Sequence, residues 1–231
     1  MLNETVALPG AEMDALLCNA EGAPKPGVVV LHEIFGVNAF VRFAAEKIAA
    51  AGYVTLAPDL YHRIAPGTGL GYDDDSRDRA LALDGELDHG RAQGDAEAAV
   101  DWLRAHPACN GKVAAVGFCL GGKVTMIAAC NGRIDAGVAF YPTKAPSFQD
   151  RLDAIVRPVQ IHLGGDDPYT PADIQDLLRT AARRNAGCEY YLHPGAKHGF
   201  FNPIRESAHN PEGAARAFTE LSRFLETHIG V

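Results

Sequence analysis

One cysteine of the sequence lies where a catalytic nucleophile would be expected. Cys119 is at the centre of GFCLGG (117–122), between an apolar segment at 113–116 and a helix predicted to begin at Leu120. This is the pattern of a nucleophile elbow, G-x-S-x-G, with cysteine in place of serine. The flanking glycines are needed because the turn from strand to helix is sharp and leaves little room for side chains. The positive amino end of the helix favours the thiolate, which is the form that attacks a carbonyl carbon.

Such a nucleophile requires a histidine to accept its proton and a carboxylate to orient the histidine ring. The loop GGDDP (164–168) follows a strand-like segment and offers Asp167 as the acid, with Asp166 as the alternative. His198 lies in the loop GAKHGF (195–200), after the next strand-like segment. Enzymes with a nucleophile elbow carry their triad in the order nucleophile, acid, histidine, and these residues keep that order.

A third loop, HEIFG (32–36), supplies further candidates. We expect the backbone N–H groups of Leu120 and Ile34 to form an oxyanion hole, because one donor follows the nucleophile and the other lies in a loop after an early strand. Glu33 is predicted to keep the thiol protonated until substrate arrives. The alternative for Glu33 is a solvated loop carboxylate.

Other histidines border predicted strands and are expected to bond to neighbouring loops. They are His32, His162 and His193, and no pair of histidines has the HExxH or a similar metal-binding spacing. We predict no metal site.

The elements that must position these residues alternate between strand and helix. Strands are predicted at 4–8, 13–18, 27–32, 54–57, 113–117, 136–141, 159–163 and 188–192, and helices at 39–51, 92–104, 120–130, 171–184 and 211–228. The first two strands form an antiparallel pair with a turn at Pro9-Gly10. The later alternation indicates right-handed crossovers and a mostly parallel, doubly wound α/β sheet with helices on both faces. In such a sheet the ligand binds beyond the carboxyl ends of the strands, where the three candidate triad residues fall.

The stretch 59–90 is rich in Gly, Pro and Asp and includes the acidic run 73–75. We predict a long irregular loop there. A solvated loop is the simpler interpretation, and a lid over the site is the alternative.

Length and composition narrow the class of protein. The chain of 231 residues fits one domain, 1–231, and its 47% of hydrophobic residues suffices for a packed core. A net charge of −8 and no cluster of Lys and Arg argue against a nucleic-acid partner. Without a basic leader or an apolar run of membrane-spanning length, the protein is expected to be cytoplasmic and off the membrane. Five widely spaced cysteines without CxxC suggest reduced thiols.

Five motifs together resemble the dienelactone hydrolases, also called carboxymethylenebutenolidases. They are HEIFG (32–36), PDLYHRIAPGTGL (58–70), GFCLGG (117–122), GGDDPYTP (164–171) and PGAKHGF (194–200). The resemblance covers nearly the whole chain and implies an α/β-hydrolase fold without a cofactor. It also implies hydrolysis of the lactone ring of dienelactone to maleylacetate, by a Cys-His-Asp triad through a thioester.

The resemblance assigns roles residue by residue. Cys119, Asp167 and His198 fall on the triad, and Glu33 falls on a glutamate thought to hold the resting thiol.

Arg63 matches an arginine that binds the substrate carboxylate; the competing interpretation is an arginine salt-bridged to the acidic loop. Tyr141 matches a tyrosine near the pocket. Asn202 stands where the family places a second carboxylate-binding arginine, and Arg205 is the nearest possible substitute. Loss of one bidentate clamp would weaken the binding of an anionic lactone.

Two other functions stay open at this point. A carboxylesterase or thioesterase acting on another small acyl substrate is possible because the fold hosts many activities. A redox-sensing or ligand-binding thiol on a non-catalytic protein is the alternative from a different class. The sequence leaves the oligomeric state open between a monomer and a small homo-oligomer.

Overall fold

The computed structural model describes residues 2–8 and 11–231, and its Cα positions group into two compact units. The first comprises the chain up to Ala114 together with Val231, and the second comprises 115–230. The turn predicted at Pro9-Gly10 lies outside the described residues. The prediction of a single domain is not tested by this division and stays a prediction.

Strands of the first unit begin with an antiparallel pair, as predicted. β1 (Leu2–Leu8) runs against β2 (Ala11–Cys18), with Leu2 opposite Leu17. β2 is antiparallel to β4 (Val54–Pro58), and β4 is parallel to β3 (Lys25–Leu31). The strand order β1-β2-β4-β3-β5 ends with β5 (Cys109–Phe118), whose last residues belong to the second unit. β3 and β4 are buried along almost their whole length, which explains their unbroken apolar sequences.

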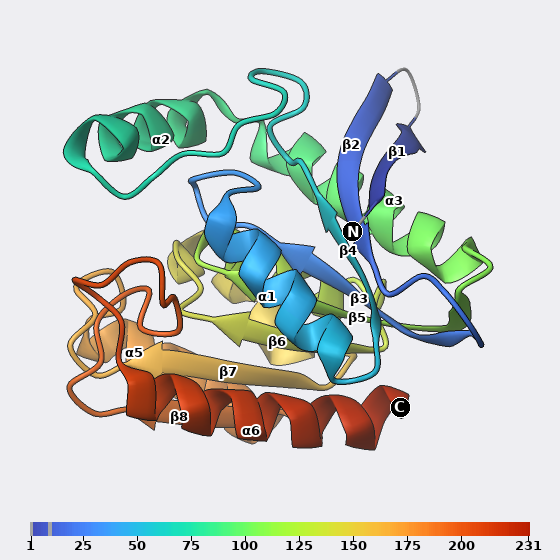
Figure 1. Cartoon of the computed structure of the whole chain (residues 1–231). Coiled ribbons are helices and arrows are strands. Elements are labelled where there is room, and N and C mark those ends of the chain that lie inside the picture. Colours follow the sequence, from blue (N-terminus) through green and yellow to red (C-terminus); the bar gives the residue numbers. More distant parts are fainter. Residues whose placement is uncertain (1, 9–10) are drawn as a thin grey trace. The chain divides into compact units, whose positions relative to one another are not determined.

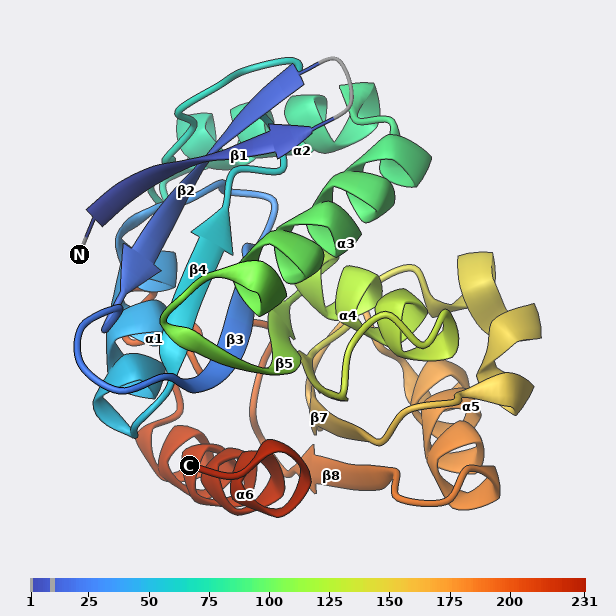
Figure 2. The same ribbon diagram turned by 90° about the vertical axis from the view of Figure 1, so that its right-hand side faces the viewer.

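Helices of the first unit lie on both sides of β3 and β4, with α1 (Ala39–Ala50) on one side and α3 (His89–Ala105) on the other (Figure 2). Asn38 caps α1, because its side-chain oxygen accepts hydrogen bonds from the N–H groups of Phe40 and Val41.

The irregular loop predicted for 59–90 is wrong in its second half, where α2 (Asp74–Glu86) forms (Figure 1). Asp73 caps this helix by accepting from the N–H of Ser76, and two more aspartates of the acidic run occupy its first turn. Carboxylates are favourable there because they face the positive end of the helix dipole. The helix was missed because only Ala80 and Leu83 are buried, so the sequence shows no apolar stripe.

The second unit has the predicted alternation of strand and helix. Its strands are β5, β6 (Ala136–Phe140), β7 (Val159–Gly164) and β8 (Glu189–His193), in that order, and β6-β7 and β7-β8 are parallel. α4 (Leu120–Cys130) and α5 (Ala172–Arg184) lie on one side of these strands and α6 (Pro211–Ile229) on the other (Figure 2). A 3-10 segment, Ala145–Ala154, was not predicted. Within the described part of the chain, no helix is both long and apolar enough to cross a bilayer.

The carboxyl ends of the second unit's strands lie side by side. Phe140 pairs with His162, and Gly164 with His193. The loops that leave β5, β6, β7 and β8 at this edge carry, in turn, Cys119, Tyr141, Asp167 and His198. The fold of this unit therefore brings together residues that are up to 79 positions apart in the sequence, from 119 to 198.

Candidate active site

The turn that carries Cys119 has the geometry of a nucleophile elbow. Cys119 immediately precedes α4 and has φ 55° and ψ −109°, a conformation that residues other than glycine rarely adopt. A side chain at Gly117 would place its Cβ 2.0 Å from the backbone oxygen of Gly121 and 2.5 Å from Oγ1 of Thr125. The N–H of Cys119 donates to the carbonyl oxygen of Phe140 at 3.0 Å, which ties the turn to the end of β6. The first glycine of the motif is thus a steric requirement.

Asp167 and His198 form the second part of the site. Oδ2 of Asp167 lies 2.8 Å from Nδ1 of His198, and both side chains are buried. The other carboxylate oxygen accepts from the N–H of Tyr169 at 2.8 Å. Asp166 is exposed, so the geometry selects Asp167 from the two candidates.

The loops carrying this acid and this histidine are joined by backbone hydrogen bonds. The N–H of Gly165 donates to the carbonyl of His193 at 2.8 Å, and the N–H of Asp166 donates to the carbonyl of Ala196 at 2.9 Å. A Cβ on Gly164 would lie 2.4 Å from that same carbonyl oxygen of Ala196. Glycine at 164 therefore lets the loops approach closely enough for Asp167 to reach the imidazole.

His198 also bonds to Cys119, and this pair determines its protonation. Burial on its own lowers the pKa of His198, but the charge of Cys119 and hydrogen bonds with Asp167 and Cys119 outweigh it and raise the pKa to about 10. Since Nδ1 faces the aspartate, Nε2 is the ring nitrogen available to the sulfur. The arrangement favours the imidazolium form of His198, with the aspartate on one side of the ring and the sulfur of Cys119 on the other.

Two tyrosines enclose the imidazole of His198. Tyr141 and Tyr169 each present a ring whose centroid is 4.8 Å from that of His198, at interplanar angles of 62° and 65°. Tyr141 is fully buried and has φ 37°, while Tyr169 is 57% exposed and covers the ring toward solvent. Tyr141 was predicted near the site. Tyr169 was missed, although it is an aromatic residue two positions after the candidate acid.

Thr143 is another residue that the sequence did not single out. Its hydroxyl oxygen lies 4.0 Å from the sulfur of Cys119, and its N–H points to the carbonyl of Cys119 at 3.5 Å. Leu120, the expected oxyanion donor, is the first residue of α4, where N–H groups have no partner within the helix. Its role stays a prediction.

In the first unit, Glu33 is a buried carboxylate, so the solvated-loop alternative for it is wrong. It is 2% exposed, and Oε2 accepts a hydrogen bond of 2.8 Å from the hydroxyl of Tyr72. The same hydroxyl accepts from the side-chain amide of Asn38 at 3.0 Å, so the cap of α1 also orients the partner of the glutamate. The carbonyl of Ile34 accepts from the hydroxyl of Tyr61 at 2.9 Å.

Arg63 has a protein carboxylate as its partner. Its guanidinium donates two hydrogen bonds of 2.8 Å to the two oxygens of Asp95 on α3, and His62 contacts the same carboxylate. Burial opposes the charge on Asp95, but these partners outweigh it and hold its pKa below the usual range. The competing interpretation named a salt bridge but placed it on the acidic run; the partner is Asp95. The role of Arg63 in substrate binding stays a prediction.

Asn202 is fully buried and caps its own turn. Its side-chain oxygen accepts from the N–H of Ile204 at 2.9 Å and of Arg205 at 3.2 Å. This use of the amide oxygen resembles an Asx turn and accounts for an asparagine at 202 without invoking substrate. His32, expected to bond to loops, accepts from the N–H of Leu60 through Nε2 at 3.1 Å. Over 2–8 and 11–231, no three His, Cys, Asp or Glu side chains gather as a metal site would require.

Comparison with known proteins gives a consistent result. The family model described as "Dienelactone hydrolase family" matches residues 13–229. The carboxymethylenebutenolidase of Pseudomonas putida is 34% identical over 204 residues, which are 87% of this chain and 86% of that protein. Carboxymethylenebutenolidase 1 of Cupriavidus pinatubonensis is 32% identical over 213 residues, 92% of this chain and 89% of that protein.

Solved structures share the fold. A Klebsiella pneumoniae structure, described as a candidate dienelactone hydrolase, superposes with a TM-score of 0.82 at 25% identity, covering 96% of each chain. The predicted α/β-hydrolase fold with a mostly parallel sheet is confirmed by this likeness and by the strand pairings.

Proposed function

Because this chain belongs to the dienelactone hydrolase family, we propose that it opens a small lactone or ester through Cys119, with His198 and Asp167 completing the triad. The chain is a hydrolase of the dienelactone type. One observation carries the finer assignment: a single buried imidazole bonds to the thiol of an elbow cysteine and to a buried aspartate 2.8 Å away.

The first half of the reaction forms a thioester. The sulfur of Cys119 attacks the carbonyl carbon of the lactone, and the carbonyl π electrons move to oxygen to give a tetrahedral oxyanion. When the oxyanion collapses, the ring C–O bond breaks and its electron pair stays on the leaving oxygen. For a dienelactone this oxygen is an enolate that remains tethered to the acyl group and takes the proton of the His198 imidazolium, which leaves the imidazole neutral. Donation from the N–H of Leu120 would stabilise the oxyanion before the bond breaks.

The second half releases the acid. His198 accepts a proton from water while the water oxygen attacks the thioester carbonyl. The second tetrahedral intermediate collapses, the C–S bond breaks and the thiolate of Cys119 leaves. The product is a carboxylic acid, and the imidazolium regained by His198 restores the starting pair. Asp167 stabilises this imidazolium in both halves without itself becoming protonated.

The substrate class is proposed from the names of the relatives and from the position at which this chain departs from the family's pattern. The curated relatives named above are carboxymethylenebutenolidases. We propose a dienelactone-like lactone as substrate, with a neutral small ester or thioester as the alternative, because Asn202 stands where an arginine is expected and its amide oxygen is used within its own turn. A substrate with one carboxylate or none fits this difference. The roles expected for Glu33, Ile34 and Arg63 remain predictions of the same scheme.

The test is steady-state hydrolysis of cis- and trans-dienelactone and of a short-chain p-nitrophenyl ester. Cys119→Ala should lower turnover of every substrate by at least about 10³-fold while leaving the circular dichroism spectrum unchanged. Retained turnover in this variant would overturn the thiol mechanism. Cleavage of the ester alone by the wild type would leave the triad in place and move the substrate away from dienelactone. No hydrolysis by the wild type would instead favour a non-catalytic thiol.

A further inference from the structure

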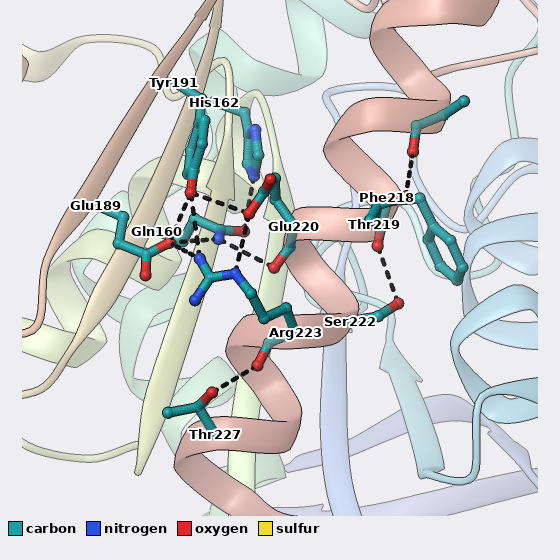
Figure 3. A network of polar contacts seen from close by, with 11 residues as sticks. Gln160, His162, Glu189, Tyr191, Phe218, Thr219, Glu220, Ser222, Arg223 and Thr227 are labelled. Atoms are coloured by element: carbon teal, nitrogen blue, oxygen red, sulfur yellow. Dashed lines mark hydrogen bonds and ion pairs between the residues drawn. The ribbon is translucent and has the colours of Figure 1, made fainter.

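A continuous set of hydrogen bonds runs from the surface of the second unit into its interior. At the outer end, Arg223 of α6 donates to Oε2 of Glu189 at 2.7 Å and to Oε2 of Glu220 at 3.0 Å. The hydroxyl of Tyr191 lies within 3.1 Å of both carboxylates. Figure 3 shows Gln160 reaching from the strand into this group, with His162 beside Tyr191.

The set continues through two histidines that the proposed mechanism does not use. Nε2 of His162 lies 2.7 Å from Oε1 of Gln160, and Nδ1 of His162 lies 3.1 Å from Nε2 of His193. Both rings are buried, and His162 is stacked between the rings of Phe140 and Tyr191 at 4.8 and 5.1 Å. Together, Gln160, His162 and His193 form what we call the histidine relay.

The ion pairs at the outer end fix the direction of every hydrogen bond in the histidine relay. The amide nitrogen of Gln160 must face Glu189, at 2.8 Å, and the carbonyl of Glu220, at 3.1 Å, because both partners can only accept. Burial opposes a charge on Glu189, but Arg223 and Gln160 outweigh it and hold the pKa of this carboxyl below its usual range. The amide oxygen of Gln160 therefore faces inward and accepts.

The tautomers of both histidines follow from that oxygen. Nε2 of His162 must carry the proton that it donates to Gln160, so a neutral His162 has a bare Nδ1. Nδ1 of His162 must then accept from Nε2–H of His193, which leaves Nδ1 of His193 as the bare nitrogen. Burial keeps the pKa of His162 well below its ordinary value, and burial with nearby Arg216 lowers that of His193 to about 4. Both rings are thus neutral and uniquely oriented near pH 7.

The inner end of the histidine relay contacts the supports of the triad. The carbonyl of His193 holds the N–H of Gly165, two residues before Asp167, and the ring of His193 lies 4.5 Å from that of Phe200, two residues after His198. The carbonyl of His162 accepts from the N–H of Tyr141, whose ring touches His198.

We propose that His162 and His193 are positioning residues for the Asp167–His198 pair, acting through their mutual hydrogen bond. With this bond intact, the ends of β7 and β8 keep a fixed separation, and the two loops that leave them hold the carboxylate against Nδ1 of His198. The inference rests on the proposed function, because its effect is read at Cys119.

Two amide substitutions at the same position separate this role from simple packing. In His162→Asn the side-chain oxygen takes the place of Nδ1, so it can accept from His193 while the bond to Gln160 is lost. In His162→Gln the side-chain nitrogen takes the place of Nε2, so it can donate to Gln160 while the N–H of His193 loses its acceptor. The two variants differ by one methylene. His162→Asn keeps the hydrogen bond to His193 and loses the one to Gln160, and His162→Gln does the reverse.

The readouts are kcat, KM and the pH dependence of iodoacetamide alkylation of Cys119, followed by peptide mass spectrometry. In His162→Gln we expect kcat to fall by about tenfold or more with KM little changed, and the alkylation midpoint to rise by about one pH unit, because a loosened Asp167 stabilises the imidazolium less. In His162→Asn, kcat should stay within about threefold of the wild-type value, and the alkylation midpoint should stay within about 0.3 pH unit of it. The charged groups around the pair are Arg216, Glu220 and Arg223 on α6 and Glu189 on β8, and they are unchanged in both variants.

Equal losses in the two variants, or an unmoved alkylation midpoint in His162→Gln, would overturn the positioning role. If either variant fails to fold, ¹⁵N-histidine NMR of the wild type decides the underlying assignment: both rings should be neutral with the proton on Nε2, and a proton on Nδ1 of either would refute it. Failure of the proposed function would be seen separately, as turnover that survives Cys119→Ala.

Discussion

The single residue on which the site depends most is His198, because it alone contacts both other members of the triad. Its Nδ1 lies 2.8 Å from Oδ2 of Asp167, and its other ring nitrogen, Nε2, is available to bond to Cys119. The rings of Tyr141 and Tyr169 flank this imidazole. In the proposed mechanism, the aspartate therefore contributes to catalysis by orienting this imidazole.

Asp167→Asn tests this contribution, and its exposed neighbour provides the control. The amide cannot stabilise the imidazolium and can favour the wrong tautomer, so kcat should fall by about 10²- to 10⁴-fold. Asp166→Asn removes the same charge one residue away and should leave kcat within about threefold of wild type. Steady-state kinetics on one substrate measures both. Equal losses in the two variants would mean that Asp167 acts through the field of the loop and not through its hydrogen bond.

Part of this residue-level picture was predictable from the sequence. Cys119 and His198 were found because glycines mark the turns that carry them. Asp167 could not be separated from Asp166 with certainty, because that choice depends on which carboxylate turns inward. Tyr169 lies within the motif GGDDPYTP (164–171) but was not singled out, and Thr143 belongs to none of the motifs. Both contacts depend on how the loops fold.

At the scale of elements, the elbow between β5 and α4 is the tightest joint of the second unit. Its first glycine has a backbone oxygen 2.0 Å from the position of a missing Cβ. Some glycines inside helices, by contrast, have open space at this position. Gly94 in α3 has no atom within 4 Å of the equivalent position. Glycine is therefore a steric requirement at 117, whereas at 94 it only adds the conformational cost of glycine in a helix.

Gly117→Ala should destabilise the protein by more than about 2 kcal/mol, because the added methyl group meets backbone that cannot move without displacing Cys119. Gly94→Ala should stabilise it by about 0.5 to 1 kcal/mol, because alanine is the better helix former and fits without contact. Urea unfolding of both variants measures the difference. A neutral result for Gly117→Ala would show that the elbow can relax.

The elements themselves were mostly predictable, and the exception is informative. Buried strands such as β3 are predictable because their sequences are runs of valine and leucine, and α6 is predictable because it has a clear apolar face. α2 has almost none, because only Ala80 and Leu83 are covered. It is specified by its cap at Asp73 and by acidic residues in its first turn, signals that were read as a solvated loop.

At the scale of the whole molecule, the free energy of unfolding should depend on the buried histidines. Their pKa values are lowered in the folded state, to about 4 for His193, so folding favours the neutral rings. This contribution to stability is fully present above the unfolded pKa of about 6.5 and is lost as the pH falls toward 4, by up to about 1.4 kcal/mol per pH unit for each proton. A protein of pI near 5.5 also loses its net negative charge over this range.

Urea unfolding at several pH values between about 7 and 4.5 measures this dependence. His193→Gln keeps a donor for His162 but cannot titrate, so its stability should fall less steeply with acid than that of the wild type. Parallel curves for the two proteins would show that His193 is not a group through which acid destabilises the fold. His193→Gln is a suitable variant although it is not at the thiol, because the free energy of unfolding is a property of the entire chain.

The left-handed backbone of Cys119 has a consequence for how such a protein can evolve. A residue with a side chain held at φ 55° costs about 1 to 3 kcal/mol relative to a relaxed conformation. Selection for stability alone would replace it with glycine, whereas under the proposed mechanism selection for chemistry opposes that change. A descendant released from its catalytic duty would be expected to lose the thiol early, and to become more heat-resistant as it did so.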